Sequence, residues 1–408
     1  MASGLPVIPS PPARPEHALL LAAAAAPAIP SLPDTDTDAV DWAAFLALAR
    51  RNRLLPLAHR LLAERTEVPE TVRSHLAAFF AENGRKALGL AAELRRLLGA
   101  MEAADVRALA YKGPALAARA YGHLALRTYS DLDLLVAPDD VPAAHRVLSE
   151  AGYESAYRLT PAQDSIFRRT DGDYPYHHPR TGALVELHCH VSSTRFGVSL
   201  PTAELIARAR PVPVGGGDVF APADDDLFLA LCLHGAKHRW ARLEWLAAAA
   251  ALAVRAGLDL DALHRRASAI GAGRTVRLAL LLMRDALSLP VTPGIGRALA
   301  ADRALPPLAA EASALWFAVD RPERAESTHA LTHSRTHALP ADDTAANLRF
   351  NFRLREGAAR RARYAAKWLF TPTPEDWAWA RLPDAASGLY RALRPLRLGL
   401  RYGLRRGG

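Results

Sequence analysis

Cysteine is scarce in this chain of 408 residues, and long apolar runs are absent. Only Cys189 and Cys232 occur, which argues against a disulfide framework and suits a reducing compartment. No stretch approaches the ~20 consecutive apolar residues that a membrane-spanning helix needs. Residues 18–29 resemble the apolar part of a secretory signal, but they are Ala-rich and contain Pro27. We therefore expect an early helix rather than a signal peptide, and a cytoplasmic protein.

β-branched residues are outnumbered by alanine and leucine, and half of all residues are hydrophobic. This composition favours a mostly helical protein with a large core, divided into two or three packed units. The charge is uneven, because residues 349–408 hold 14 Lys or Arg and 4 Asp or Glu, against a net charge of +9 for the chain. The body of the protein is therefore nearly neutral, and its C-terminal segment is basic.

Changes in periodicity along the chain predict five segments. In order, these are a Pro-rich disordered tail at 1–16, a helical unit at 17–104, an α/β core at 105–222, a helical domain at 223–345, and a basic helical segment at 346–408. Within the helical domain, periodic runs predict helices at 226–239, 243–256, 260–270 and 273–287. The polar, His-rich stretch at 321–345 is predicted to be a loop.

The most informative motif is Asp131-Leu132-Asp133, at the start of an apolar run. It follows a predicted strand at 106–111 and a predicted helix at 115–121, and it opens a predicted strand at 131–136. In a strand the two aspartates point to the same side, roughly 6.6 Å apart along the chain. Two such carboxylates repel each other unless a cation lies between them. The motif favours a magnesium site for phosphoryl or nucleotidyl transfer over a pair of solvated edge-strand acids.

A later predicted strand, at 183–191, supplies a third acid. Its alternation separates an apolar face from a polar face, and the apolar face must be the buried one. The apolar face consists of Val185, Leu187, Cys189 and Val191, and the other of Leu184, Glu186, His188 and His190. If this strand neighbours the strand at 131–136, Glu186 completes a triad of carboxylates.

Together these motifs resemble the polymerase β-like nucleotidyltransferase superfamily, and more closely a bacterial family of uncharacterised nucleotidyltransferases. The resemblance is carried by Tyr111-Lys112-Gly113, by residues 127–136 and by Val185-Glu186-Leu187-His188, and it extends from about Asp41 to the C-terminus. It implies an α+β fold, in which a mixed sheet with helices forms the nucleotidyltransferase core at 105–222 and helical units flank it on both sides.

The resemblance also implies roles for individual residues. Two Mg²⁺ ions would be bound by Asp131, Asp133 and Glu186, the last of which could also serve as the base toward the acceptor, and His188 would support this triad from the second shell. The residues expected at the nucleoside triphosphate (NTP) are Lys112, Gly113, Arg127, Lys237 and His238. For Arg127, an ion pair with Asp131 is an equal alternative. Pro114 departs from the usual Gly-Ser or Gly-Gly and removes one amide donor.

The predicted activity is transfer of a nucleoside monophosphate from an NTP such as ATP to an acceptor hydroxyl or phosphate, with release of pyrophosphate. Whether the acceptor is a small molecule, a peptide or a saccharide does not follow from the sequence. One alternative is a catalytically idle nucleotide-binding or scaffold protein of the same fold. Another is a zinc-dependent hydrolase, since His234 and His238 stand at the i, i+4 spacing that can bind zinc on a helix.

The Arg-rich C-terminus has three interpretations. Its leucines and arginines recur at helical spacing, as Leu389, Leu393, Leu396 and Leu400 and as Arg391, Arg394, Arg397 and Arg401. The first interpretation packs the leucines against the body and leaves the arginines in solvent. The second is binding of RNA or nucleotide phosphate. Contact with a membrane surface is the least favoured of the three.

Overall fold

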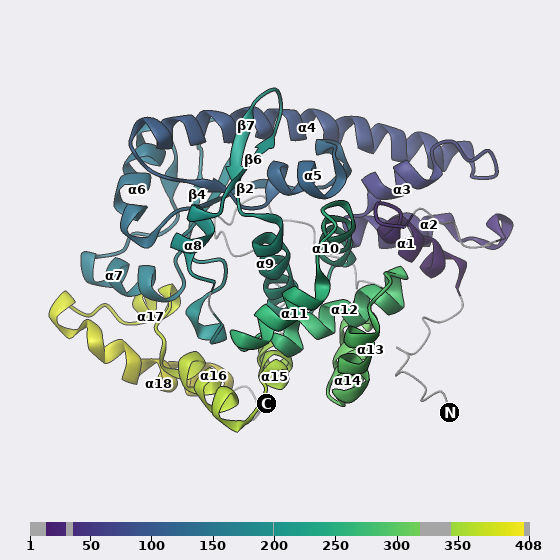
Figure 1. Cartoon of the computed structure of the whole chain (residues 1–408). Helices are drawn as coiled ribbons and strands as arrows, with labels where there is room; N and C mark the ends of the chain where they lie inside the picture. Colours follow the sequence, from purple (N-terminus) through teal and green to yellow (C-terminus); the bar gives the residue numbers. More distant parts are fainter. Residues whose placement is uncertain (1–13, 30–35, 199, 319–343, 404–408) are drawn as a thin grey trace.

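The computed structural model describes residues 14–29, 36–198, 200–318 and 344–403. At its centre is a five-stranded mixed sheet with the strand order β1-β2-β5-β4-β3 (Figure 1). The strands are β1 (Leu109–Ala110), β2 (Asp131–Leu135), β3 (Glu154–Ser155), β4 (Asp173–His177) and β5 (Leu184–His188). Strand β2 pairs with β5 in parallel, whereas the other neighbours are antiparallel. The prediction of an α+β fold with a mixed sheet is confirmed.

The two faces of the sheet differ in chemistry, as the alternation along its strands predicts. Leu132 and Leu134 of β2, with Val185 and Leu187 of β5, lie in a hydrophobic core with residues of α4 (Glu70–Ala103) and α6 (Val141–Glu150). The opposite face carries the acids of β2 and looks toward α9 (Asp224–Lys237) and α10 (Leu243–Arg255). The apolar face therefore anchors the two strands, and the acidic face meets the helical part of the chain.

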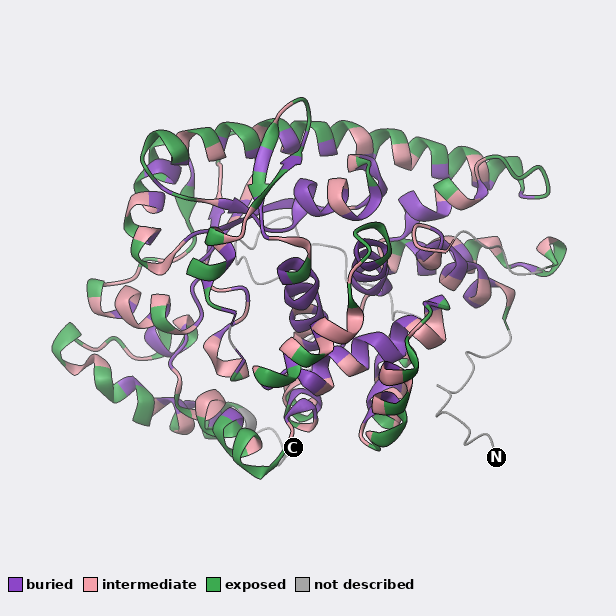
Figure 2. Ribbon diagram, viewed as in Figure 1, coloured by how far each residue is buried: buried purple, intermediate pink, exposed green. Residues whose placement is uncertain are grey.

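Helix α4 joins these two parts of the molecule. It spans 34 residues and crosses the whole of the upper edge in Figure 1. Val72 and Leu76, near its start, pack in the helical core, whereas Leu94 and Met101, near its end, pack under the sheet. Its outer side is exposed along most of its length (Figure 2).

The helical core combines helices that precede the sheet in the sequence with helices that follow it. Helices α1 to α3 pack in one hydrophobic cluster with α9 to α14. The helices not yet given are α1 (Pro15–Ala25), α2 (Trp42–Arg51), α3 (Leu55–Leu62), α11 (Leu260–Ala269), α12 (Gly273–Leu287), α13 (Pro293–Ala301) and α14 (Leu305–Ala314). The four helices predicted between residues 226 and 287 are all present within two residues of their predicted ends. Alanines fill α10, so that this helix is buried on nearly all sides and packs closely on α9 and α5 (Gly113–Tyr121).

Several elements differ from the sequence prediction. Strand β1 is shorter than predicted, while helix α7 (Pro161–Thr170), the short helix α8 (Thr202–Ala207) and the hairpin of β6 (Arg210–Pro213) and β7 (Asp218–Ala221) were not predicted. Of the predicted tail at 1–16, residues 1–13 lie outside the described residues, and α1 already begins at Pro15. The predicted loop at 321–345 also lies outside them, apart from its last two residues, which begin α15 (Thr344–Leu354).

The C-terminal segment forms three further helices beside the sheet, at the lower left of Figure 1. They are α16 (Ala358–Phe370), α17 (Pro374–Trp379) and α18 (Tyr390–Gly403). The predicted packing of the leucines against the body holds for Leu393, which is partly buried against the core under the sheet, but it is wrong for the other three leucines. Arg394 and Arg397 are buried, whereas Leu389, Leu396 and Leu400 are exposed. The reason is a buried carboxylate, Asp376 of α17, which forms ion pairs with both arginines.

Candidate metal and nucleotide site

The acids of β2 and β5 meet because the two strands are adjacent and in register. Asp133 is the direct partner of Glu186, and Leu135 is the partner of His188. Ligand atoms of Asp133, Glu186 and His188 all lie within 4.8 Å of one another. The structure therefore brings the third acid to the Asp-x-Asp motif on the same face of the sheet.

His188 lies among the acids rather than behind them, where the sequence had placed it. Its Nε2 is 3.0 Å from Oδ1 of Asp133 and 3.4 Å from Oε2 of Glu186, and its Nδ1 is 2.8 Å from Oδ1 of Asp173. Burial alone would lower the pKa of His188, but Asp173 and the other two carboxylates outweigh it and raise that pKa well above its usual value. The three carboxylates around His188 therefore favour its protonated, cationic form.

Sequence reasoning missed Asp173, which is the first residue of β4 and lies opposite His188 in the antiparallel pair. Burial would raise its pKa, but the attraction of His188 and the charge of Lys237 bring that pKa down to about 2. Counting back along the predicted hairpin from its turn at 179–182 would have placed Asp173 opposite His188. The sequence thus contained the information that places Asp173 opposite His188, but only through the register of the hairpin.

Lys112 is the second cation at the site. Its Nζ lies 2.9 Å from Oδ1 of Asp133, and both side chains are buried. Burial would raise the pKa of Asp133, but Lys112 and His188 reverse this and keep it well below the usual range. Lys112, predicted to contact the nucleotide, therefore compensates the charge of a carboxylate of the site.

Asp131 lies on the same face but stands outside the close group of three. With Asp133 and Lys112 it lines a cavity of about 20 Å³ against α9 and α10. A volume of this size holds about one water molecule or one bare ion. Burial, with repulsion from Asp133 and Glu186, raises the pKa of Asp131 to about 6.

Gly113 is required by the backbone. It is the first residue of α5 and has a φ of +50°, in the left-handed region that side chains disfavour. A Cβ at this position would make only an ordinary van der Waals contact, 3.5 Å from the backbone oxygen of Asp131, so the constraint is the backbone conformation and not the space. This turn directs Lys112 at the acids and starts the helix beside them.

Arg127 has a different partner from those considered in the sequence. Its Nε lies 2.6 Å from Oε1 of Glu244 in α10, and both residues are buried. The amide of Asn83 in α4 donates to the backbone oxygens of Ala125 and Arg127. Arg127 therefore anchors the loop before β2 to the helices on either side.

A cleft of about 490 Å³ opens from these acids toward the C-terminal helices. Glu186, His188 and Asp173 line one side of it, and Lys237 and His238, at the end of α9, line another. Nζ of Lys237 is 3.9 Å from Oδ2 of Asp173. Of the predicted nucleotide contacts, the cleft thus receives Lys112, Lys237 and His238, but neither Gly113 nor Arg127 is among its lining residues.

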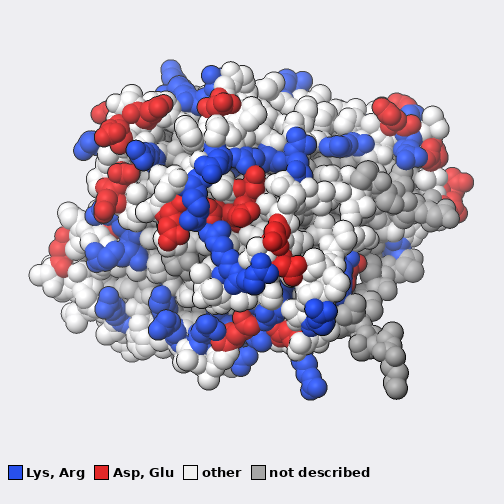
Figure 3. Space-filling model, in the orientation of Figure 1, with Lys and Arg blue, Asp and Glu red and all other residues white. Residues whose placement is uncertain are grey.

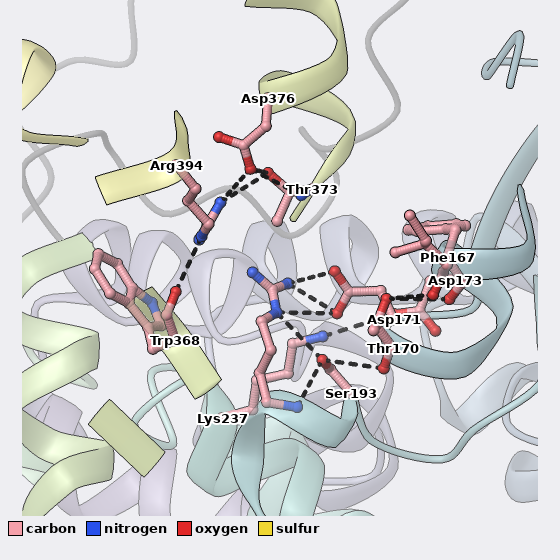
Figure 4. Close-up of polar contacts among 12 residues, drawn as sticks. Phe167, Thr170, Asp171, Asp173, Ser193, Lys237, Trp368, Thr373, Asp376 and Arg394 are labelled. Atoms are coloured by element: carbon pink, nitrogen blue, oxygen red, sulfur yellow. Dashed lines mark hydrogen bonds and ion pairs between the residues drawn. The ribbon is translucent and has the colours of Figure 1, made fainter. Parts of the chain in front are cut away.

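Two separate ion-pair groups lie along the cleft, one beside Asp173 and one on the C-terminal helices (Figure 4). Arg394 donates to Oδ2 of Asp376 at 2.7 Å and to the backbone oxygen of Trp368 at 3.0 Å. Arg195 contacts Oδ2 of Asp171 at 2.7 Å. The cleft therefore runs from the acids of the sheet, with Arg195 and Asp171 beside them, to Arg394 and Trp368 on the C-terminal helices.

Among the described residues, no third His, Cys, Asp or Glu forms a metal-binding group with His234 and His238, as the zinc alternative would need. His234 and His238 lie with ring centroids 4.9 Å apart, and both pack against Trp245. Among the residues that the structure describes, Asp133, Glu186 and His188 form the only group of three potential metal ligands with mutually close atoms. A catalytic zinc site usually has three protein ligands, so the geometry disfavours this alternative.

A mixed sheet with acids converging from two adjacent strands, beside the start of a helix after Lys-Gly, defines a protein of the nucleotidyltransferase class. The sequence model of a family described as uncharacterised nucleotidyltransferase matches residues 38–288, which is more than half of the chain. The chain belongs to this family. No curated protein matches it at a significant level. Among the described helices, none combines the length and the apolar character that crossing a membrane requires.

Proposed function

We propose that the protein is a Mg²⁺-dependent nucleotidyltransferase, which moves a nucleoside monophosphate from an NTP to an acceptor hydroxyl or phosphate and releases pyrophosphate. The observation that carries the proposal is the register of β2 and β5, which sets Asp133 beside Glu186 on the acidic face. Such a pair of carboxylates, one buried and one half-buried, costs free energy through desolvation and repulsion unless cations compensate it. The family of the chain supports the class of reaction.

The donor set fits magnesium. Asp131, Asp133 and Glu186 offer only carboxylate oxygens, which are the hard ligands that Mg²⁺ prefers. Lys112 and His188 supply the positive charge in the metal-free protein, and they would have to yield their contacts with Asp133 on metal binding. Bound Mg²⁺ would neutralise phosphate charge and align the attacking and leaving oxygens.

The chain's own groups are arranged for a single displacement. Glu186 lines the open cleft, whereas Asp131 and Asp133 line the small inner cavity. An acceptor hydroxyl in the cleft can therefore pass its proton to the Glu186 carboxylate as its oxygen attacks the α-phosphorus. The bond from the α-phosphorus to the bridging oxygen breaks, and pyrophosphate leaves with that electron pair. The cations Lys237 and Lys112 along the cleft would attract the phosphates.

The test uses labelled triphosphates. The purified protein is incubated with each NTP labelled at the α-phosphate, with Mg²⁺ and cell extract, and the labelled product is identified. We expect label to reach an acceptor from the α-position but never from the γ-position, and chelation by EDTA to stop the transfer. Transfer of γ-label would instead show phosphoryl transfer and overturn the proposal.

The idle nucleotide-binding protein is kept as a second candidate, because one observation favours it. Asp133 already has two cationic partners, so its charge is compensated without a metal. Calorimetry with ATP, with and without Mg²⁺, separates the two candidates when it is paired with a pyrophosphate-release assay. Binding without any release in the presence of extract would favour the idle protein.

A further inference from the structure

Helix α18, together with Leu389 just before it, turns three leucines outward, although Tyr390 and Leu398 of the same helix are buried. Leu389, Leu396 and Leu400 have exposed fractions of 57%, 61% and 55%, and their spacing of seven and four residues places them along one stripe of the helix. A helix on the surface of a globular protein normally buries such a stripe. Here Arg394 and Arg397 occupy the buried side instead.

Exposed apolar residues are concentrated in this part of the molecule. Nine large hydrophobic residues of the described chain are exposed, and six of them lie within residues 344–403. Phe370 ends α16 with 46% of its surface exposed, and Trp379 ends α17 with 49% exposed. Both helices pack against α18. The same three helices therefore present aliphatic and aromatic side chains to solvent.

The same segment is strongly basic. Residues 349–408 hold 14 Lys or Arg against 4 Asp or Glu. The arginines classed as exposed in the three helices and the turns between them are Arg360, Arg363, Arg381, Arg391 and Arg401. In Figure 3 this region, at the lower left, shows separate basic side chains set in a largely uncharged surface. We call the exposed residues Phe370, Trp379, Arg381, Leu389, Leu396 and Leu400 the C-terminal surface.

We propose that the C-terminal surface docks onto an anionic phospholipid membrane. An amphipathic helix with leucines and aromatic residues beside arginines binds at the interface of such a bilayer, because apolar burial and attraction to anionic headgroups add together. RNA would engage the arginines but would leave the leucine stripe in water. A symmetric contact with a second copy would bring two strongly basic segments together, which is unfavourable.

Docking would also orient the cleft. Arg394, Arg397, Leu398 and Arg401 of α18 line the cleft, on the side of the helix away from the leucine stripe. A membrane bound by the stripe therefore lies one helix diameter, about 10 Å, from the cleft wall. The surface thus places the cleft close to the lipid headgroups, independently of which reaction takes place in it.

The test is flotation of the full chain with vesicles. Vesicles of phosphatidylcholine alone are compared with vesicles that also contain phosphatidylglycerol. We expect binding to the anionic vesicles that weakens with salt, and a loss of at least about 10-fold in the double variant Leu396→Gln, Leu400→Gln, because both side chains enter the interface. Since these leucines are exposed, the double variant should keep the unfolding midpoint of the wild type.

The matched control is Leu88→Gln in α4, a leucine with a similar exposed fraction of 60% on another part of the molecule. It should bind vesicles as the wild type does. Three results would overturn the proposal: no binding to anionic vesicles, equal binding to both kinds of vesicle, or unchanged binding by the double variant. Self-association that the double variant abolishes, without vesicle binding, would assign the surface to a second copy instead. Vesicle binding is measured without nucleotidyl transfer. A failure of the membrane proposal can therefore be distinguished from a failure of the proposed function on which it does not depend.

Discussion

Buried carboxylates occur both at the candidate site and elsewhere in the molecule, and their cationic partners differ. Each of three buried acids, one at the site and two outside it, contacts two cations. Asp226 pairs with Arg208 and Arg266, Asp376 with Arg394 and Arg397, and Asp133 with Lys112 and His188. Only the acid at the site has partners other than arginine.

The difference is chemical. A guanidinium keeps its proton in proteins and binds a carboxylate through a fixed fork of donors, so the arginine groups are permanent cross-links between helices. Lysine is a point charge on a flexible stem, and histidine changes charge readily. The partners of Asp133 can therefore leave when another cation arrives, whereas the partners of Asp376 cannot be exchanged in this way. Asp133 thus differs from Asp226 and Asp376 in the chemistry of its partners, and this difference is what the proposed binding of a metal at Asp133 requires.

The largest expected effect is a loss of activity when the acid at the site is replaced, but not when an acid of the scaffold is replaced. Asp133→Asn should lower Mg²⁺-dependent pyrophosphate release by about 1000-fold or more, equivalent to roughly 4 kcal/mol of transition-state stabilisation. Glu186 and Asp173 still compensate His188, but the buried Lys112 loses its carboxylate, so denaturant unfolding of the variant is recorded beside its activity. Asp226→Asn is the matched control, as it removes an equally buried acid of the scaffold. Full activity in Asp133→Asn would show that the acid pair does not bind the catalytic metal.

Removal of a buried acid outside the site should lower stability. Asp376→Asn leaves the buried guanidinium groups of Arg394 and Arg397 without their carboxylate, and we expect the free energy of unfolding of the C-terminal helices to fall by about 3 kcal/mol. Denaturant unfolding, with proteolysis of this segment as a local probe, measures the effect. The exposed Asp139→Asn serves as control. A loss no larger than that of the control would mean that the arginines find other partners.

The acids of the candidate site were easier to predict from the sequence than the ion pairs that hold the surrounding elements in place. The period of two in a strand fixes which residues share a face, so the sequence alone predicted that Glu186 joins Asp131 and Asp133 once β2 and β5 are neighbours. The ion pair of Arg127 with Glu244 joins residues 117 apart in sequence, and no local pattern encodes it. For α18, the helical period grouped Leu396 with Leu400, but which side meets the body depended on Asp376, in another helix.

A smaller effect is expected one contact away from the metal ligands. Asp173→Asn removes the carboxylate that orients Nδ1 of His188, and changes to such supporting partners typically cost 10-fold to 100-fold in metal affinity or activity. The Mg²⁺ concentration for half-maximal pyrophosphate release should rise within this range. Asp164→Asn, which removes an acid bonded to Tyr174 in the same part of the fold, should leave it unchanged. Equal responses of the two variants would remove Asp173 from the site.

The smallest effect concerns the dependence of stability on pH. Burial would raise the pKa of Asp376, but the hydrogen bond and the attraction of Arg394 outweigh it, so this pKa lies below its usual value in the folded protein. A carboxyl group with a lowered folded pKa stabilises the protein above its unfolded pKa of about 4, and this stabilisation is lost as the pH falls through the folded pKa. The difference in unfolding free energy between wild type and Asp376→Asn should therefore be constant above about pH 5 and should shrink below about pH 4. Unfolding curves of both proteins, recorded from above about pH 5 down to about pH 2, test this. If the difference in unfolding free energy stays constant over this whole range, the pKa of Asp376 is not lowered.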